Sequence, residues 1–388
     1  MTDVIPVARV QRYAGPGWID MLAQPVRFHK TAPHASPTLP GSPAHHAPRK
    51  PFVRRRGDLS QQIRLASQVV FGSIAALAGI QFVMWVRYFE SGGTTTRVAR
   101  PGGVEAWLPI AALMNLKAFV LTGEVPQVHP AGMFMLVAFL SISLLYRKAF
   151  CSWICPVGTI SEWLWQTGKT WFRFTLTPPR WLDIPLRGLK YILLALFLYV
   201  VVTMPVPDIR AFLGSPYGLV ADVKMLDFFR HMGRATAIFL AVLVVTSLVV
   251  KNAWCRFLCP YGALMGLVAL VSPTRITRNA EACIDCAKCA KACPAGLPVD
   301  TLLSIHSAEC TACMSCVAAC PAVGALDLTM GVRRSRSVVT PWALALGIVV
   351  LFCGIVAFAR WNGYWHTPIP DSVYFDLVPR SSEFAHPR

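Results

Sequence analysis

Eight cysteines near the C-terminal end of the chain have a spacing suited to iron–sulfur chemistry. Two successive runs share the pattern Cys-x2-Cys-x2-Cys-x3-Cys-Pro. Three thiolates spaced by two residues can surround one corner of a cubane cluster, and the fourth, set before a proline, ligates the other cluster. The spacing therefore predicts one [4Fe–4S] cluster held by Cys283, Cys286, Cys289 and Cys320. It predicts a second cluster held by Cys310, Cys313, Cys316 and Cys293.

This spacing is typical of two-cluster bacterial ferredoxins, which carry electrons. Structural zinc and disulfides are the alternatives. Zinc sites take four ligands as two pairs, whereas the eight cysteines form two matching quartets. We therefore expect a small α+β ferredoxin-like module at residues 273–332, with two [4Fe–4S] clusters as its cofactors.

Four further cysteines form two pairs with one signature, aromatic-Cys-x3-Cys-Pro-x-Gly. The pairs are Cys151 with Cys155, and Cys255 with Cys259. Residues i and i+4 lie on one face of a helix, so each pair would present two thiols together before the proline ends the helix. We expect an additional redox, metal or iron–sulfur site at these four cysteines. The alternative is that they only end helices and pack.

The likeness between the pairs extends upstream of them. A Pro-x7-Lys segment ends at Lys117 before the first pair and at Lys224 before the second. We infer two homologous units, residues 104–168 and 211–272. Parallel repeats related by an axis along the membrane normal would bring the four cysteines together. Lys117 and Lys224 are candidates for a polar site at the other end of the units; the alternative is that they snorkel. His129 and His231 at that end are expected to be solvated, with haem or quinone contact as the alternative.

The composition places much of the chain in lipid. Of its 388 residues, 55% are hydrophobic and 14% are charged, whereas soluble proteins carry about 25% charged residues. The net charge is +18, but the basic residues lie in blocks beside apolar runs, which indicates membrane topology and excludes nucleic acid as a partner. We expect a mainly α, polytopic membrane protein in contact with lipid. Its predicted spanning helices are residues 65–86, 131–146, 191–207, 235–250 and 338–359.

The basic residues also predict the orientation of these spans. Segments on the side of the N-terminus hold 26 Lys and Arg residues, against 11 on the other side, and basic residues favour the cytoplasmic side. We expect the N-terminus and the ferredoxin module to be cytoplasmic and a tail at 360–388 to be periplasmic. Residues 1–58, rich in proline and basic residues, are expected to be a disordered tail, and residues 59–272 to form the transmembrane region.

Paired Cys-x3-Cys-Pro motifs followed by a double ferredoxin run resemble the membrane polyferredoxins of the NapH, NosR and CcoG type, over about residues 65–360. The resemblance implies a carrier in the bacterial inner (plasma) membrane, with cytoplasmic clusters linked to a quinone pool or a periplasmic partner. It implies cofactor or metal roles for all twelve motif cysteines. Residues 1–58 are too few for the flavin domain of NosR-type proteins. The 29 residues after Ala359 are too few for the C-terminal β-domain of the CcoG type.

These features predict an electron-transfer subunit of an oxidoreductase system rather than a self-contained enzyme. It would relay single electrons between a quinone pool or a cytoplasmic donor and a partner reductase. The first alternative is a copper reductase or assembly factor for a respiratory oxidase, in which the helix-borne thiols bind Cu(I), since soft thiolates select it. The second is a structural anchor whose clusters only stabilise the fold.

Overall fold

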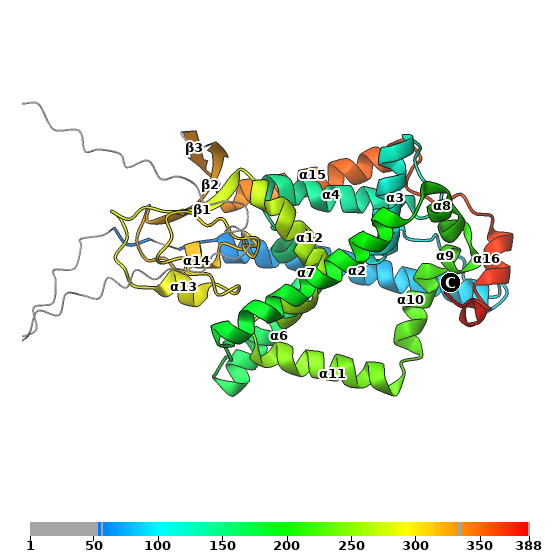
Figure 1. Ribbon diagram of the computed structural model, residues 1–388, viewed down its shortest axis with the longest axis horizontal. Helices are drawn as coiled ribbons and strands as arrows, with labels where there is room; N and C mark the ends of the chain where they lie inside the picture. The colour runs from blue at the N-terminus through cyan, green and yellow to red at the C-terminus, as the bar shows by residue number, and fades with distance from the viewer. Residues whose placement is uncertain (1–52, 56, 333–334, 387–388) are drawn as a thin grey trace, which may run out of the picture. The chain divides into compact units, whose positions relative to one another are not determined.

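The computed structural model describes residues 53–55, 57–332 and 335–386 (Figure 1). Most of the predicted disordered tail therefore lies outside the described residues. Its last part lies against the ferredoxin module instead of apart from it. The amide of Arg55 donates to the carbonyl of Pro321 at 2.8 Å, and the amide of Val323 donates to the carbonyl of Val53 at 3.0 Å.

Among the described residues, three helices are long and apolar enough to cross a membrane. They are α2 (Ser60–Glu90), α7 (Arg180–Thr203) and α15 (Pro341–Trp361). A fourth span results if α10 (Ala221–Arg230) and α11 (Arg234–Val249), which meet at a bend of 81°, are taken together. The remaining predicted span coincides with α4 (Pro130–Tyr146), whose 17 residues are at the lower limit for a spanning helix. The predicted class, a helical membrane protein, is confirmed.

Helix α7 begins at Arg180, eleven residues before the predicted start of that span at Tyr191. Its first turns carry charges that contact other parts of the chain. The Arg187 guanidinium donates to the carbonyl of Ala295 in the ferredoxin module at 3.0 Å. These polar contacts explain why hydropathy alone misses the start of the helix.

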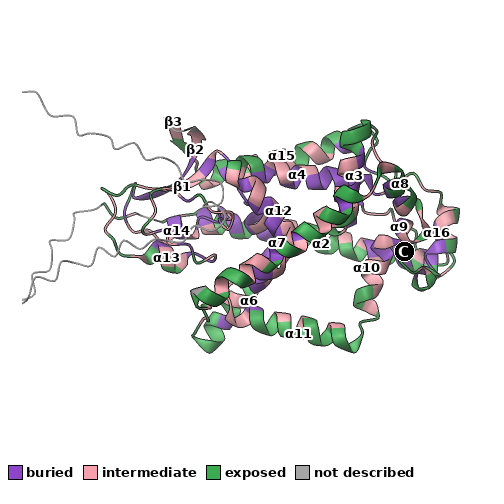
Figure 2. Cartoon of the chain, in the orientation of Figure 1, coloured by how far each residue is buried: buried purple, intermediate pink, exposed green. Residues whose placement is uncertain are grey.

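Burial separates one central helix from the helices around it. Helix α4 is buried along most of its length, where it packs against α15, α3 (Pro109–Thr122) and α12 (Pro260–Val268). Figure 2 shows mostly exposed residues along α11, and many along α2. Many of the exposed residues are apolar, and a bilayer accommodates such surfaces better than water does. They include Ile74, Leu77 and Ile80 of α2, Ile238, Phe239 and Val242 of α11, and Leu346 and Val350 of α15.

The elements around the two cysteine pairs follow the same order. In the first unit, α3 and α4 precede the short helix α5 (Phe150–Trp153) and then α6 (Pro156–Phe172). In the second, α9 (Pro216–Leu219), α10 and α11 precede the π-helix η2 (Trp254–Leu258) and then α12. A proline occupies the first turn of α3, α6, α9 and α12, where its missing N–H costs no hydrogen bond.

The ferredoxin module contains the one sheet of the described residues. Strands β1 (Thr274–Arg278), β2 (Leu326–Val332) and β3 (Ser335–Val338) are antiparallel in that order, with Ile276 opposite Leu328. Two short helices, α13 (Lys288–Ala292) and α14 (Ser315–Ala318), carry cysteines beside it. Figure 1 shows this module at one end of the long helices, and α8 (Val206–Gly214) and α16 (Asp371–Leu377) near the opposite end.

Candidate iron–sulfur sites and a four-cysteine cavity

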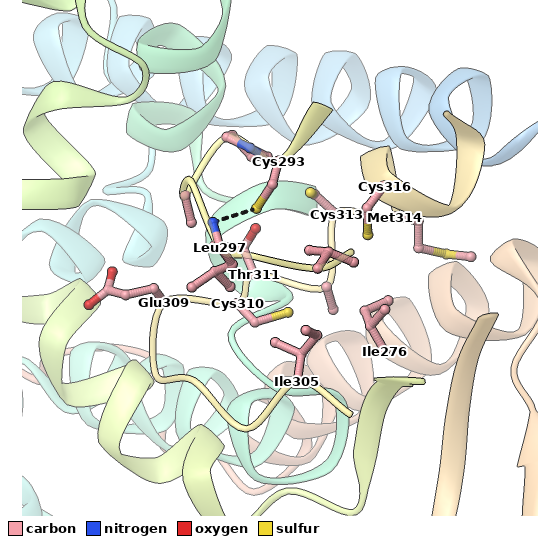
Figure 3. A pocket seen from close by; sticks show the side chains of 14 residues that line it. Ile276, Cys293, Leu297, Ile305, Glu309, Cys310, Thr311, Cys313, Met314 and Cys316 are labelled. Carbon is pink, nitrogen blue, oxygen red and sulfur yellow. Dashed lines mark hydrogen bonds between the residues drawn. The ribbon is translucent and has the colours of Figure 1, made fainter. Parts of the chain in front are cut away.

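Four cysteines surround one pocket in the ferredoxin module (Figure 3). One comes from the first run of the sequence and three come from the second, as the crossed assignment requires. The pocket encloses about 360 Å³ including its open mouth, and Ile276 and Ile305 form part of its apolar lining. We call this the second-cluster site; its cysteines, all buried, are Cys293, Cys310, Cys313 and Cys316.

The other predicted quartet also gathers in space, closer to the surface. Cys320 lies within electrostatic range of Cys283 and Cys286, and Cys289 within range of Cys320. Cys286 is exposed, whereas Cys289 is buried. We call these four residues the first-cluster site. The structure thus groups the eight module cysteines as the spacing predicted, and their assignment as ligands stays a prediction.

Both cysteine loops have an unusual backbone that suits an anionic cluster. In each loop the residues on either side of the middle cysteine, Cys286 or Cys313, have left-handed φ angles although none is glycine. Such residues cost about 1–3 kcal/mol each and cluster at functional sites. Alternation into the left-handed region aims backbone N–H groups inward and forms an anion-binding nest. The four residues are Asp285 (φ 53°), Ala287 (53°), Ala312 (49°) and Met314 (57°).

The protonation of the buried thiols couples cluster binding to pH. Burial raises the pKa of Cys293 to about 12 and that of Cys316 well above its ordinary value. Iron is bound by the thiolate, so ligation must displace these protons. The second-cluster site is therefore expected to load less readily at low pH.

The Cys-x3-Cys pairs do not lie on continuous helices, and that prediction is wrong. Cys151 lies in α5, but Cys155 has an extended backbone and is the N-cap of α6. Cys255 lies in η2, and Cys259 is the N-cap of α12, where its Sγ accepts from the Gly262 amide at 3.2 Å. The proline after each second cysteine starts a new helix at that point.

The four paired thiols nevertheless gather in one place. Cys151 interacts electrostatically with Cys155 and Cys259, and Cys255 with the other three. A cavity of about 550 Å³, open mouth included, is lined by Cys151 and Cys255 together with Cys313 of the second-cluster site. Within the described ranges, no three His, Cys, Asp or Glu side chains lie close enough to hold a single metal ion. Of the four paired cysteines, Cys151 and Cys255 line the cavity itself. We call the four thiols and this cavity together the four-cysteine cavity.

Two hydrogen bonds join the four-cysteine cavity to the second-cluster site. Ser152 Oγ donates to the carbonyl of Thr311 at 2.7 Å, and Trp153 Nε1 donates to the carbonyl of Ala312 at 3.2 Å. Ser152 and Trp153 lie inside the first Cys-x3-Cys pair, and the two acceptors lie between Cys310 and Cys313. Trp153 is fully buried. Sequence reasoning missed both donors because it treated the residues between the cysteines as spacers.

Buried ion pairs surround this region. Arg64 pairs with Glu162 through two contacts of 2.6 and 2.7 Å, and Lys190 pairs with Glu309 at 2.6 and 2.7 Å. Burial raises the pKa of Glu309, but Lys148 and Lys190 outweigh it and hold that pKa at about 2. Glu309 lines both the second-cluster pocket and the four-cysteine cavity as a carboxylate.

A second polar cluster lies at the end of the helices away from the module. Arg100 pairs with Glu105 at 2.8 Å and with Asp222 at 2.7 Å. His129 Nε2 is 2.8 Å from the carbonyl of Gly218, and the imidazole is buried. The expectation of a solvated His129 is therefore wrong, because partners distant in sequence enclose it.

The repeat-matched lysines near this end both donate to backbone carbonyls. Lys117 Nζ contacts the carbonyls of Val201, Val202 and Met204 at 2.6–3.1 Å, at the C-terminal end of α7. Lys224 Nζ donates to the carbonyl of Ser381 at 2.6 Å. Bonds to the last carbonyls of a helix stabilise its end, so these contacts account for Lys117 structurally.

A helical membrane protein that combines a two-run cysteine module with paired helix-end cysteines belongs to the class of membrane-bound 4Fe–4S electron carriers. A "4Fe-4S binding domain" family matches residues 128–179 and 233–279, once around each cysteine pair. A "4Fe-4S dicluster domain" family matches residues 275–321. The chain belongs to the family of membrane polyferredoxins of the NapH and NosR type, and its [4Fe–4S] cofactors are thereby confirmed.

Curated relatives match the chain over different lengths. YccM of Escherichia coli K12, named as an electron transport protein, is 49% identical over 326 residues, which cover 83% of this chain and 91% of YccM. The methylamine utilization ferredoxin-type protein MauN of Paracoccus denitrificans is 31% identical over 173 residues, 44% of this chain and 56% of MauN. The ferredoxin-type protein NapH of E. coli K12 is 27% identical over 158 residues, 39% of this chain and 51% of NapH. No solved structure matches the chain.

Proposed function

We propose that the chain relays single electrons between a soluble partner and an acceptor or donor in the membrane, such as a quinone. The route runs through the first cluster, the second cluster and a redox centre in the four-cysteine cavity. The observation that carries the proposal is the direct hydrogen bonding of the second-cluster loop to the first Cys-x3-Cys pair.

The exposure of the cysteines supports this order. Cys286 of the first-cluster site is exposed, so a soluble partner can approach that cluster closely. All four cysteines of the second-cluster site are buried, so that cluster exchanges electrons with its neighbours. Each bound cluster supplies one-electron chemistry, and the protein sets its potential through charge, hydrogen bonds and burial. The ligand sets in this proposal are the crossed quartets given above.

We place the N-terminus and the module in the cytoplasm and the C-terminus in the periplasm of a bacterial cell. The bias of 26 basic residues against 11 supports this orientation. A periplasm-dependent reporter such as alkaline phosphatase should be active when fused after the C-terminus and inactive when fused in the loop after β3. The reverse pattern would overturn the orientation.

The role of the four-cysteine cavity is tested by replacing Cys151 and Cys155 together with serine. The purified wild-type chain should hold metal beyond the roughly eight irons of two cubane clusters. The double variant should lose only that extra metal and should no longer pass electrons from the module. Cys353→Ser is the control, because this exposed cysteine of α15 stands alone in the sequence. If metal content and turnover are both unchanged, the two Cys-x3-Cys pairs serve only to end helices.

A copper reductase is the second candidate, and the gathering of four thiols favours it. Soft thiolates select Cu(I) over harder ions. Metal analysis of the same variants separates the two functions. If the Cys151→Ser/Cys155→Ser variant loses iron, the relay is supported. If added Cu(II) reoxidises the clusters of the wild-type chain and the chain then retains Cu(I), the reductase is supported.

A further inference from the structure

Lys148 is a buried lysine beside the four-cysteine cavity. It lies between α4 and α5, is 3% exposed, and lines the cavity with Cys151 and Cys255. A methyl group at Gly262 would lie 3.5 Å from Lys148 Nζ and 3.6 Å from Cys259 Sγ. The ammonium and this thiol are therefore no more than about 7 Å apart. Lys148 thus faces cysteines from both pairs.

Several charged neighbours of Lys148 form ion pairs, whereas Lys148 itself does not. In the part of the chain that the structure describes, its ammonium makes no hydrogen bond and has no carboxylate oxygen within 4 Å. Glu309 interacts with it at longer range, but the Glu309 oxygens are bonded to Lys190 and Tyr191. The paired neighbours are Arg64 with Glu162, Arg256 with Asp183, and Lys190 with Glu309.

An isolated buried ammonium is unfavourable unless an anion compensates it. Glu309 compensates this charge from a distance, but its oxygens are bonded to Lys190 and Tyr191. The candidates for a direct counter-charge to Lys148 are therefore the four sulfurs. A separate feature also favours negative charge there. Cys155 and Cys259 are the N-caps of α6 and α12, where free backbone N–H groups and the helix dipole stabilise thiolates.

We propose that Lys148 is the buried counter-charge of an anionic, thiolate-ligated redox centre formed by Cys151, Cys155, Cys255 and Cys259. This inference rests on the proposed function, because it requires a metal centre at these cysteines. The centre gains one electron as the second cluster is oxidised, and no proton is needed. A nearby cation stabilises the more negative, reduced form, so Lys148 raises the reduction potential of the centre. It acts through the thiolates and is a positioning residue.

The test uses the full chain purified in detergent. Lys148→Met and Lys148→Gln both remove the charge, and Lys148→Gln keeps a polar side chain in case Lys148→Met misfolds. Lys148→Arg keeps the charge. Lys251→Met is the matched control, because Lys251 is the basic residue that precedes the second cysteine pair. Unlike Lys148, it is only partly buried, and its Nζ donates to the carbonyl of Lys291 at 3.0 Å. Metal content is counted, and potentials are read by redox titration with electron paramagnetic resonance (EPR).

Both neutral variants should keep the two module clusters and show the centre either lost or titrating at a lower potential. Lys148→Arg and Lys251→Met should keep the centre at its wild-type potential. If the Cys151→Ser/Cys155→Ser variant loses the centre while Lys148→Gln keeps it at an unchanged potential, the role of Lys148 is refuted and the relay stands. If the wild-type chain holds no centre beyond the two clusters, both proposals fall.

Discussion

Replacing Trp153 by phenylalanine should loosen the second-cluster site without disturbing the first. The indole is fully buried, and its Nε1 donates to the carbonyl of Ala312, next to Cys313. Phenylalanine keeps most of the ring volume but cannot donate. The carbonyl of Ala312 is then buried without this partner. Ser152→Ala should act in the same way on the carbonyl of Thr311, which lies beside it.

The expected size of the effect follows from the cost of an unpaired polar group. Leaving a buried acceptor without its donor costs about 1–3 kcal/mol. A change of about 1.4 kcal/mol shifts an equilibrium tenfold. If the loop opens locally before iron leaves, the open population should rise roughly 5- to 140-fold. The two substitutions remove adjacent bonds, so their effects need not add.

Iron release to a chelator under anaerobic conditions measures this opening. Trp153→Phe should speed release from the second cluster by the factor given above, with the first cluster unchanged. Trp163→Phe is the control, because Trp163 is 44% exposed and surface substitutions usually change stability by less than about 0.5 kcal/mol. Equal release from Trp153→Phe and Trp163→Phe would refute the idea that these bonds hold the loop in place.

Three further predictions concern separate parts of the chain. Cys293→Ser should damage the second cluster, although its neighbours in sequence serve the first; loss of the first cluster instead would contradict the crossed assignment. Arg55→Met should lower the potential of the first cluster, because Arg55 interacts electrostatically with one of its cysteines, whereas the exposed Arg54→Met should not change it. Burial raises the pKa of Glu105, but Arg100 outweighs it and holds the pKa at about 2, below the ordinary 4.5. The stabilisation that the Glu105 carboxylate gives the folded state should therefore be complete above pH 4.5 and be lost as the pH falls toward 2. The thermal unfolding temperature of Glu105→Gln should lack this pH dependence.

The cysteine spacing predicted the family and the cofactors because cluster ligation requires one residue type at fixed separations. Spacing also predicted two groups of module cysteines, and each group lies together in the structure; their role as ligands stays a prediction. Spacing could not predict the left-handed alanine and methionine residues around Cys286 and Cys313, since these residue types rarely adopt that conformation. The helix breaks at Cys155 and Cys259 could have been predicted from the prolines that follow them, because proline is common in the first turn of a helix.

Long-range contacts were beyond sequence reasoning. His129 is enclosed by Gly218, 89 positions away, and Arg100 reaches Asp222 across 122 positions. Local pattern carries no information about such partners. The missing ion-pair partner of Lys148 likewise follows only from the positions of its neighbours. In the sequence, Lys148 is a basic residue beside an apolar run, which is ordinary in a membrane protein.

In the proposed relay, electrons leave the module through the second cluster and the four-cysteine cavity. The most direct test reduces the chain in lipid vesicles with dithionite, removes the excess anaerobically, and adds a lipophilic quinone. EPR of samples frozen at increasing times then follows each cluster. The second cluster should be reoxidised before the first, and both should stay reduced in Cys151→Ser/Cys155→Ser. Reoxidation that begins at the first cluster, or that is equally fast in the variant, would contradict the relay.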